Sequence, residues 1–312
     1  AIKHVIERAG KVIADHHDEI DAQIRAHETL PGTCTVLAAS LDGATVLLNE
    51  KGTKPGRPGE RPGVAPCGET PTSYKVAMVG SVSFYGVAQE EGKTPPRLAS
   101  HYTARMPEEY TETFKAHFER EVYAAQALCG PGVEKVVLLD GAKNLWKYVN
   151  TTPLFDDYIK VVDFFHATEH LSKIGELLFG KGTDMAAYWY DKYRSCMRDD
   201  VGGVECMLRS VDYYSKKNTL SKAARAELAK KRGYFLHNKA RMNYGELRAR
   251  GLPIGSGPVE AACKTLVKTR LCRSGMRWSR KGGQCILDFR TYVKSNRWNE
   301  AWQEIRTVEK AA

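Results

Sequence analysis

The beginning of the chain has the repeating pattern of an amphipathic helix. Over residues 2–28 apolar side chains recur at intervals of three and four. They are Val5, Ile6, Ala9, Val12, Ile13, Ile20 and Ile24. The run HHDE at 16–19 offers metal-binding side chains, but adjacent helical residues point in different directions. We therefore interpret 16–19 as a solvated face of the helix.

Short apolar runs rich in β-branched residues come next and predict strands. TVLAASLDGATVLL (35–48) predicts two strands joined by a tight turn at the Asp-Gly pair 42–43, because this dipeptide favours hairpin turns. YKVAMVGSVSFYG (74–86) predicts a third strand, and RLASHYTARM (97–106) is compatible with another. Residues 51–71 are rich in Pro and Gly without an apolar run, which predicts a flexible basic loop.

The rest of the chain is predicted to contain a helix, two buried strands and a long helical region. Residues 107–128 predict a helix with Pro at its start and acids in its first turn. EKVVLLDGA (134–142) and YIKVVDFFH (158–166) are short apolar runs typical of buried parallel strands. Residues 167–250 have a helical pattern, with a break expected at 202–203. This order predicts a mixed α/β core with a helical insertion.

Composition narrows the class of protein. The chain has 312 residues, 42% hydrophobic and 27% charged, which excludes disordered, collagen-like and coiled-coil proteins. No apolar stretch approaches the roughly 18 residues of a membrane span, and the charged first helix is no signal peptide. The chain begins without Met, which indicates a processed product or a start inside a longer protein. Its eight cysteines are scattered without metal-finger spacing, as expected for reduced thiols.

Positive charge is concentrated in the last third of the chain. The chain carries a net +10, of which residues 215–250 contribute +9 and residues 260–312 contribute +7. The rest of the chain therefore carries −6. A basic region joined to an acidic body favours a surface for a polyanion such as nucleic acid, although a solvated basic surface is the alternative.

Three acids are candidates for catalysis. Asp42 and Asp140 each follow an apolar run and precede a Gly. Each alone is an ordinary turn residue, but the repetition favours one site at the ends of buried strands. Glu260 falls in the first turn of a helix that begins after GSG (255–257). It either complements the helix dipole or completes a cation site with the two aspartates.

Basic side chains near the third acid are candidates for DNA contact. Lys264 and Lys268 follow Glu260 at intervals of four, on the same helical face. The other candidates are Arg270, Arg273, Arg277, Arg280 and Lys281, together with Arg241 in the helical region. Trp278 is a candidate for base stacking, with a place in the core as the alternative.

Asp163 and His166 form a further candidate pair. Asp163 ends a predicted strand and His166 opens the next helix. A helix cap or a structural Asp–His hydrogen bond is as plausible as a part in catalysis. We interpret the two as supporting a metal site or contacting the scissile region.

The three acids together resemble the DDE triad of bacterial insertion-sequence transposases. The element DFFH (163–166) resembles the DxxH motif of Mutator-like transposases. The sequence RSGMRWSRKGGQCILDFRTYVKSNRWNEAW (273–302) resembles the C-terminal segment of proteins in the ISKra-type branch of that superfamily. The resemblance extends over residues 33–302, with 97 residues between Asp42 and Asp140 and 119 between Asp140 and Glu260.

The resemblance implies an RNase H-like mixed sheet with flanking helices, interrupted by an all-helical insertion domain. The expected domains are an N-terminal helix and linker (1–32), the first part of the core (33–180), the helical insertion (181–250), and a final core helix with basic helices (251–312). We expect the N-terminal DNA-binding region usual in such proteins to be absent from this chain or reduced to residues 1–30.

The resemblance also implies a reaction. Asp42, Asp140 and Glu260 would bind two Mg²⁺ ions, which Mn²⁺ can replace, and Asp42 is expected to bridge them. The expected activity is DNA strand cleavage and strand transfer, on transposon ends and target DNA. A homodimer or larger assembly on the nucleoid of a bacterial cytoplasm is expected. The alternatives are a nuclease of the same fold without strand transfer and a catalytically silent DNA-binding protein descended from a transposase.

Overall fold

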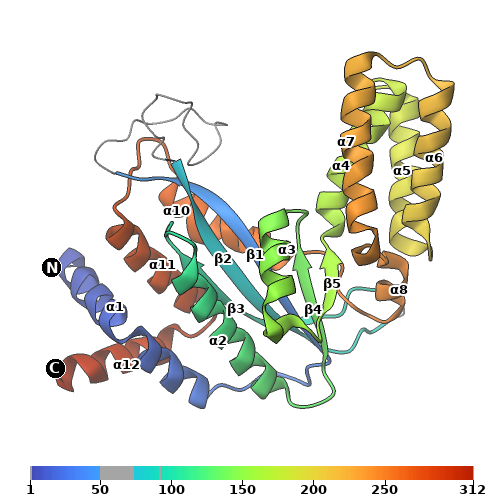
Figure 1. Cartoon of the computed structure of the whole chain (residues 1–312). Coiled ribbons are helices and arrows are strands. Elements are labelled where there is room, and N and C mark those ends of the chain that lie inside the picture. The colour runs from blue at the N-terminus through green and yellow to red at the C-terminus, as the bar shows by residue number, and fades with distance from the viewer. Residues whose placement is uncertain (1, 50–73, 91–92, 312) are drawn as a thin grey trace. The chain divides into compact units, whose positions relative to one another are not determined.

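A computed structural model of the chain describes residues 2–49, 74–90 and 93–311 (Figure 1). The predicted loop at 51–71 lies outside the described residues. The strands are β1 (Val36–Leu47), β2 (Tyr74–Tyr85), β3 (Arg97–Arg105), β4 (Glu134–Leu139) and β5 (Ile159–Val162). They form a mixed sheet in the order β3-β2-β1-β4-β5 with helices around it, which confirms a mixed α/β architecture.

The chain divides into two compact units. Unit 1 combines residues 1–84, 97–133 and 257–312, and unit 2 combines residues 85–96 and 134–256. The helices of unit 1 are α1 (Ile2–Ala26), α2 (Glu112–Cys129), α9 (Gly257–Ala262), the π-helix η3 (Cys263–Lys268), α10 (Thr269–Leu271), α11 (Arg280–Lys294) and α12 (Trp298–Ala311). Unit 1 is therefore built from three stretches of chain, and 123 residues separate the second stretch from the third.

The core of unit 1 lies between its strands and the segment that begins at Gly257. Val46 and Val79 from the strands pack with Val259, Leu266 and Leu287 in one buried cluster. The strands supply alternating apolar residues to this face, and the helices supply a matching apolar stripe.

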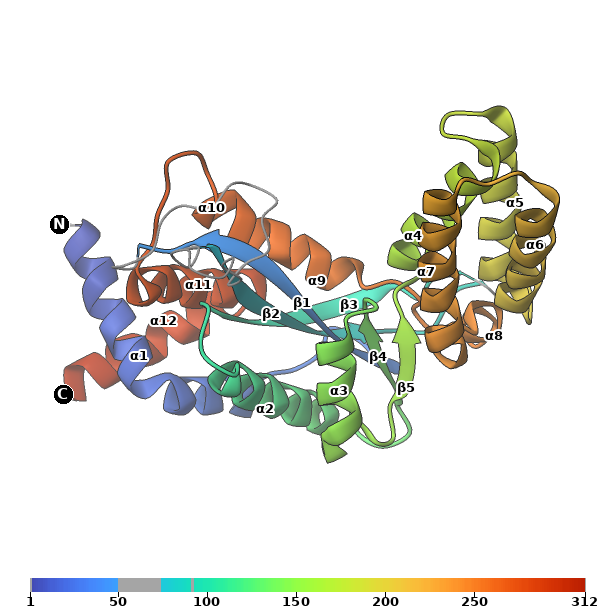
Figure 2. The same cartoon turned by 45° about the horizontal axis from the view of Figure 1, so that its top comes forward.

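A second apolar cluster holds α1 against the C-terminal helices. Ile13 and Ile20 of α1 pack with Tyr292 of α11 and with Ala301 and Ile305 of α12. Figures 1 and 2 both show α1, α11 and α12 side by side, near the two ends of the chain. The amphipathic helix predicted at 2–28 is thus confirmed, and its buried stripe has a partner.

The tight turn predicted at Asp42-Gly43 is wrong, because both residues lie inside the continuous strand β1. A Cβ added at Gly43 would come within 2.6 Å of the Val76 side chain, so strand pairing exploits the small glycine. Tertiary packing has overridden the local preference of an Asp-Gly pair. Similarly, α2 begins five residues after Pro107, because Tyr110 and Thr111 have left-handed backbone angles.

Unit 2 contains a parallel strand pair and a group of helices. The pairing of β4 with β5 is parallel, as predicted, with Val136 opposite Ile159. Its helices are α3 (Lys143–Thr151), η1 (Pro153–Phe155), α4 (Phe164–Phe179), α5 (Asp184–Asp199), α6 (Gly203–Lys217), α7 (Lys222–Asn238), η2 (Lys239–Arg241) and α8 (Tyr244–Ala249). Figures 1 and 2 show α4, α5, α6 and α7 packed side by side. The helical region predicted from residue 167 and its break at 202–203 are confirmed.

Two broad expectations from composition also hold for the described residues. Among them, no helix has the length and apolar character needed to cross a membrane. The seven cysteines that the structure describes are all free thiols.

Candidate active-site residues

Asp42 and Glu260 come together in unit 1 around the buried thiol of Cys263. Asp42 lies in the middle of β1, and Glu260 is exposed in the first turn of α9, where η3 continues the helix to Cys263. Burial, the charge and hydrogen bond of Asp42, and the charge of Glu260 all raise the pKa of Cys263. Two of the three predicted acids therefore share one neighbourhood although 217 residues lie between them in sequence.

The local contacts of Asp42 orient its carboxylate. Its Oδ1 accepts a hydrogen bond from the backbone N–H of Gly43 at 2.6 Å, and the Cys263 thiol is its neighbour. Because the pKa of Cys263 is raised, the thiol stays protonated at neutral pH and does not compete as a soft metal ligand. The potential metal ligands are carboxylate oxygens, which suit Mg²⁺ or Mn²⁺.

The helix that carries Glu260 widens just after it. Residues 263–268 form a π-helix, in which the Thr269 hydroxyl donates to the Lys264 carbonyl five residues earlier. This π-helix interrupts the regular α-helical spacing of Glu260, Lys264 and Lys268, and all three side chains are exposed. Such π-bulges are rare and occur frequently at functional sites.

Asp140 belongs to unit 2, directly after β4. Its Oδ1 accepts from the backbone N–H of Ala142 at 2.8 Å, and its carbonyl accepts from the Trp146 indole at 2.7 Å. Gly141 must be glycine, because an added Cβ would lie 2.2 Å from the Tyr234 ring. The loop after β4 thus holds Asp140 in a fixed, half-exposed position.

Asp163 is a structural residue of unit 2. Its side chain is fully buried, and its Oδ1 accepts from the backbone N–H of His166 at 2.6 Å, which caps α4. Its Oδ2 accepts from the backbone N–H of Ser256, 93 residues further along. Since both carboxylate oxygens serve backbone donors, the N-cap interpretation fits Asp163 better than metal contact.

His166 and His170 line the side of α4 that faces Tyr234 on α7. The rings of His170 and Tyr234 stack at 3.9 Å, and His166 lies 5.2 Å from His170. Burial and the charge of Lys231 lower the pKa of His170 to about 4, so its imidazole is neutral at pH 7. His170 is therefore partly enclosed between α4 and α7.

Two buried tyrosine hydroxyls beside this group could not be found from the sequence. The hydroxyls of Tyr234 and Tyr244 accept and donate no hydrogen bond within the described part of the chain. Burial and the charges of Asp140 and Asp163 raise the pKa of Tyr234, and burial raises that of Tyr244. Unsatisfied buried hydroxyls are costly, and they mark the surroundings of Asp140 as a polar interior.

The basic residues predicted to contact DNA lie mostly at the surface of unit 1. The exposed ones are Lys264, Lys268, Arg270, Arg273, Arg277, Arg280 and Lys281. Trp278 differs from them, because its indole donates to the Leu271 carbonyl at 3.1 Å and its ring packs on the core of unit 1. These contacts give Trp278 a packing role and leave base stacking as a prediction.

Arg241 in unit 2 has a different environment from these exposed cations. Its guanidinium lies 4.3 Å from the centre of the Trp146 ring, and burial lowers its pKa. It is partly enclosed, so only part of the side chain faces solvent. Its contact with phosphate remains a prediction.

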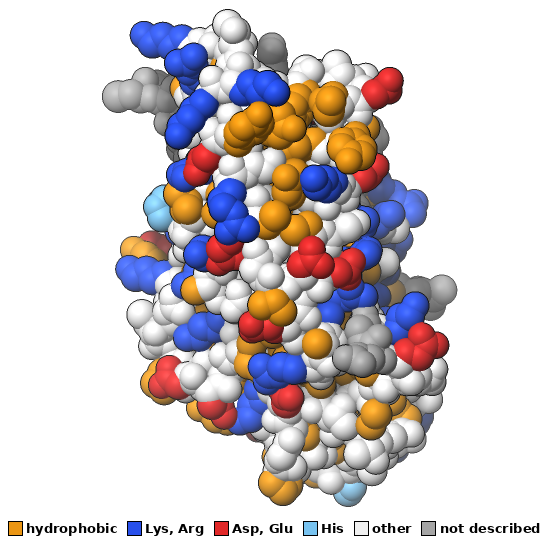
Figure 3. Space-filling model, turned by 90° about the vertical axis from the view of Figure 1, so that its right-hand side faces the viewer, with side chains coloured by type: hydrophobic (Ala, Val, Ile, Leu, Met, Phe, Trp, Pro, Cys, Tyr) orange, Lys and Arg blue, Asp and Glu red, His pale blue; other side chains and the backbone are white. Residues whose placement is uncertain are grey.

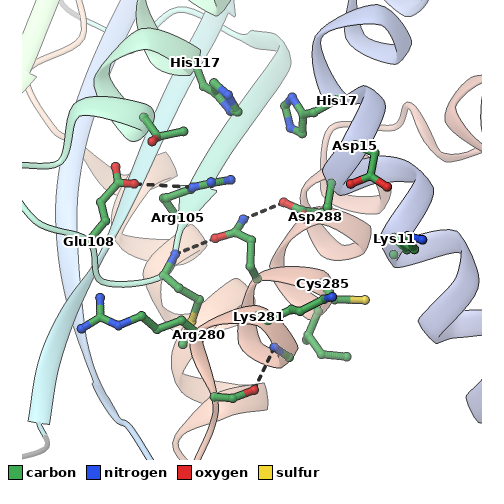
Figure 4. A pocket seen from close by; sticks show the side chains of 18 of the residues that line it. Lys11, Asp15, His17, Arg105, Glu108, His117, Arg280, Lys281, Cys285 and Asp288 are labelled. Atoms are coloured by element: carbon green, nitrogen blue, oxygen red, sulfur yellow. Dashed lines mark hydrogen bonds and ion pairs between the residues drawn. The ribbon is translucent and has the colours of Figure 1, made fainter. Parts of the chain in front are cut away.

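A cavity of about 1710 Å³ in unit 1 is a feature that the sequence did not reveal (Figure 4). Its walls come from α1, from the end of β3, from α2 and from α11. Figure 4 shows His17 and His117 pointing toward one another on one side of it, with Arg105 and Asp288 nearby. The two histidines are 100 positions apart in sequence, so no local pattern indicates that they meet.

The surface of unit 2 carries exposed aromatic side chains among cations. Figure 3 shows hydrophobic side chains gathered toward one end of the helices, with Lys and Arg around them. Met185, Tyr188 and Tyr213 are more than half exposed, whereas Trp189 and Tyr193 are buried. The aromatic residues of this region thus divide between the interior and the surface.

Comparisons with known proteins identify no family. No protein-family model matches the chain, and no curated protein matches it. A solved structure described as NurA bound to dAMP and manganese aligns at 12% identity, over 96% of this chain and 62% of that chain, with a TM-score of 0.13. This chain therefore spans less than two thirds of that protein. A likeness this weak carries no structural or functional argument.

Proposed function

We propose that this protein is a DNA transposase of the DDE type, with an RNase H-like core and a helical insertion. Asp42, Asp140 and Glu260 are the proposed catalytic and metal-binding residues. The observation that carries the proposal is that Asp42 and Glu260, remote in sequence, both act on Cys263. Asp42 is partly exposed and Glu260 is exposed, and exposed lysines follow Glu260. This arrangement suits a cation that must contact a phosphate group.

The donors present suit magnesium. Carboxylates that converge repel one another unless cations neutralise them, and the adjacent Cys263 is held as a neutral thiol. Two bound Mg²⁺ or Mn²⁺ ions would supply an activated water or 3′-hydroxyl and stabilise the leaving oxygen of an in-line displacement. Asp42, Asp140 and Glu260 would hold these ions.

Hydrogen bonds within the chain orient the carboxylates of the proposed site. Hydrogen bonds from Gly43 to Asp42 and from Ala142 to Asp140 each hold one carboxylate oxygen, which fixes the plane of the carboxylate. The buried cap Asp163 ties the start of α4 to Ser256, immediately before the segment that carries Glu260. The exposed cations on η3 and beyond would hold the DNA backbone through phosphate contacts.

The decisive experiment is divalent-ion-dependent cutting of plasmid DNA that carries candidate transposon ends. We expect Asp42→Asn, Asp140→Asn and Glu260→Gln each to lower the cleavage rate at least about 100-fold while DNA binding persists, because a metal ligand is removed. Asp191→Asn and Glu300→Gln are the matched controls, since both acids are exposed and Glu300 also lies in a first helical turn. Unchanged cleavage in the three variants would refute the proposal.

The products and the metal position separate the alternatives. Joined products indicate transposition, cut ends alone indicate a nuclease, and binding without any cutting indicates a silent DNA-binding protein. With Fe²⁺ in place of Mg²⁺, hydroxyl radicals cleave backbone close to the metal. Cuts near residues 42, 140 and 260 in one experiment support a shared site, and cuts confined elsewhere contradict it.

The proposal includes partners and a location. Transposon ends and target DNA are the proposed ligands, and cutting two ends together requires a homodimer or larger assembly. The proposed location is the bacterial cytoplasm, on the nucleoid. Cross-linking of the protein with and without end DNA tests the assembly.

A further inference from the structure

A kink in α1 turns one of its histidines toward another helix. The helix has non-helical backbone angles at His16 (φ −129°, ψ 25°). Directly after the kink, the ring of His17 stacks on that of His117 from α2, with centroids 4.3 Å apart and planes 24° apart. Both residues belong to unit 1, and Figure 4 shows the two rings facing one another. The interpretation of 16–19 as wholly solvated is therefore wrong for His17.

Three potential metal ligands meet at this place. Single donor atoms of His17, Asp18 and His117 all lie within 4.8 Å of one another. Nδ1 of His17 is buried and makes no hydrogen bond within the described part of the chain. The nearest carboxylates, those of Asp21 and Asp18, are 3.6 Å and 3.8 Å away from it, beyond hydrogen-bond distance. A buried imidazole nitrogen that has no hydrogen-bond partner and lies close to other donor atoms is a candidate metal ligand.

The surroundings can hold a cation. The side chains of His17 and His117 are 21% and 15% exposed, so the protein encloses most of both rings. Asp18, Asp21 and Asp288 supply acidic groups around the histidines, against Arg105 and Arg120. Oδ1 of Asp18 lies 3.8 Å from Nδ1 of His17 and 3.8 Å from Nε2 of His117, and the same oxygen accepts a hydrogen bond from Arg120.

A second His–carboxylate cluster in unit 1 provides a contrast. Glu28, His101 and Glu121 also lie within ligand distance of one another. There Arg297 donates to both glutamates and also lies 2.8 Å from Nδ1 of His101, so an arginine already takes the place of a cation beside the imidazole. The His17 cluster has no equivalent arginine on its imidazole nitrogens among the described residues. This difference decides between the two.

We propose that His17, Asp18 and His117 bind a divalent transition-metal ion, Zn²⁺ by their ligand type, at the wall of the unit 1 cavity. Two imidazoles and one carboxylate favour zinc over magnesium, and three protein ligands leave one coordination position open. Asp18 is largely exposed, so solvent reaches that position. The ion would tie α1 to α2, and it is separate from the acids proposed for DNA cleavage.

The test uses the full chain, freed of metal with EDTA and titrated with Co²⁺ as a spectroscopic probe and with Zn²⁺ in competition. We expect one ion per chain with visible absorption typical of nitrogen and oxygen ligands. His17→Gln and His117→Gln should each weaken binding at least about 100-fold, because each removes a direct ligand. Asp18→Asn is the milder variant, since this exposed side chain does not fill the core, and we expect at least about 10-fold weaker binding from it.

Controls distinguish this site from the proposed catalytic one. His27→Gln changes an exposed histidine near the end of the same helix and should leave binding unchanged. Glu260→Gln should also leave it unchanged. Melting curves in EDTA check that each variant folds like the parent chain. Absence of Co²⁺ binding by the parent chain, binding that survives His17→Gln and His117→Gln, or binding that disappears in Glu260→Gln overturns the proposal.

Discussion

Glu121 illustrates how one buried carboxylate is stabilised by its neighbours. Its Oε1 accepts from Arg297 at 2.7 Å and lies 2.9 Å from Nδ1 of His101, and its Oε2 accepts from Arg25 at 2.8 Å. Burial alone would raise its pKa, but the charges and hydrogen bonds of its partners hold the pKa well below the usual 4.5. The folded protein therefore binds this proton less readily than the unfolded chain.

That difference gives a pH-dependent contribution to stability. It is fully present above about pH 4.5, the pKa of the unfolded chain, and is lost as the pH falls through the lower folded pKa. We expect Glu121→Gln to be less stable than the parent chain at pH 7, by a margin that shrinks below pH 4.5. Urea unfolding at a series of pH values measures this, with Glu300→Gln as the exposed control. A margin that stays constant with pH contradicts the assignment.

At the scale of residues, the sequence predicted local roles better than long-range ones. The cap formed by Asp163 on α4 follows from its place before an apolar helix, which the sequence shows. Its second bond, to Ser256, joins segments 93 residues apart, and no local pattern encodes it. The stacking of His17 on His117 was missed for the same reason.

At the scale of elements, two glycines of unit 2 can be compared. One is required by close contact between two helices, and the other only weakens the helix in which it lies. A Cβ at Gly203, where α6 begins, would lie 2.1 Å from the Cys196 carbonyl oxygen of α5, so the helices meet backbone to backbone. A Cβ at Gly233, inside α7, would meet only the His237 ring at 3.8 Å. The first glycine is required by packing, and the second is not.

We expect Gly203→Ala to destabilise unit 2 by roughly 2 kcal/mol or more, because backbone atoms must move apart. Gly233→Ala should instead stabilise it by roughly 0.5–1 kcal/mol, the helix preference of Ala over Gly. Chemical denaturation followed by circular dichroism measures both. Equal effects of the two substitutions would show that α5 and α6 are not in close contact.

The strands show why element prediction failed where it did. The parallel pair β4 and β5 was predicted because buried parallel strands are short and apolar throughout. The Asp-Gly pair in β1 predicted a turn, yet the buried residues on both sides of it keep the strand continuous. Local turn chemistry yields to pairing with a neighbouring strand, and that pairing is a property of the whole unit.

At the scale of the whole molecule, charge is the property that sequence alone reports best. The net +10 and its concentration in the last third are fixed by composition. Lys264, Arg273 and Arg277 are exposed, as DNA contacts require. Which of them touches phosphate depends on a bound duplex.

The proposed function predicts a steep salt dependence of DNA binding. Replacing Lys264, Arg273 and Arg277 with Gln together should lower the slope of log affinity against log salt by about 0.9 for each phosphate group that the variant no longer neutralises. The variant Arg306→Gln changes an exposed cation on α12 and serves as the control. Binding titrations in EDTA, which prevents cleavage, give the slopes. A slope that stays at the parent value removes this surface from the DNA interface.

The division of unit 1 along the chain has a consequence during synthesis. The last core residue on the strand side is Met106, directly after β3, whereas the helical residues that cover the strands begin at Val259, 153 residues later. At about 5–20 residues per second, the ribosome needs roughly 8–30 s to make that interval. Throughout it the nascent strands present an uncovered apolar face, so this unit completes its folding only after the helices from Val259 onward have been made.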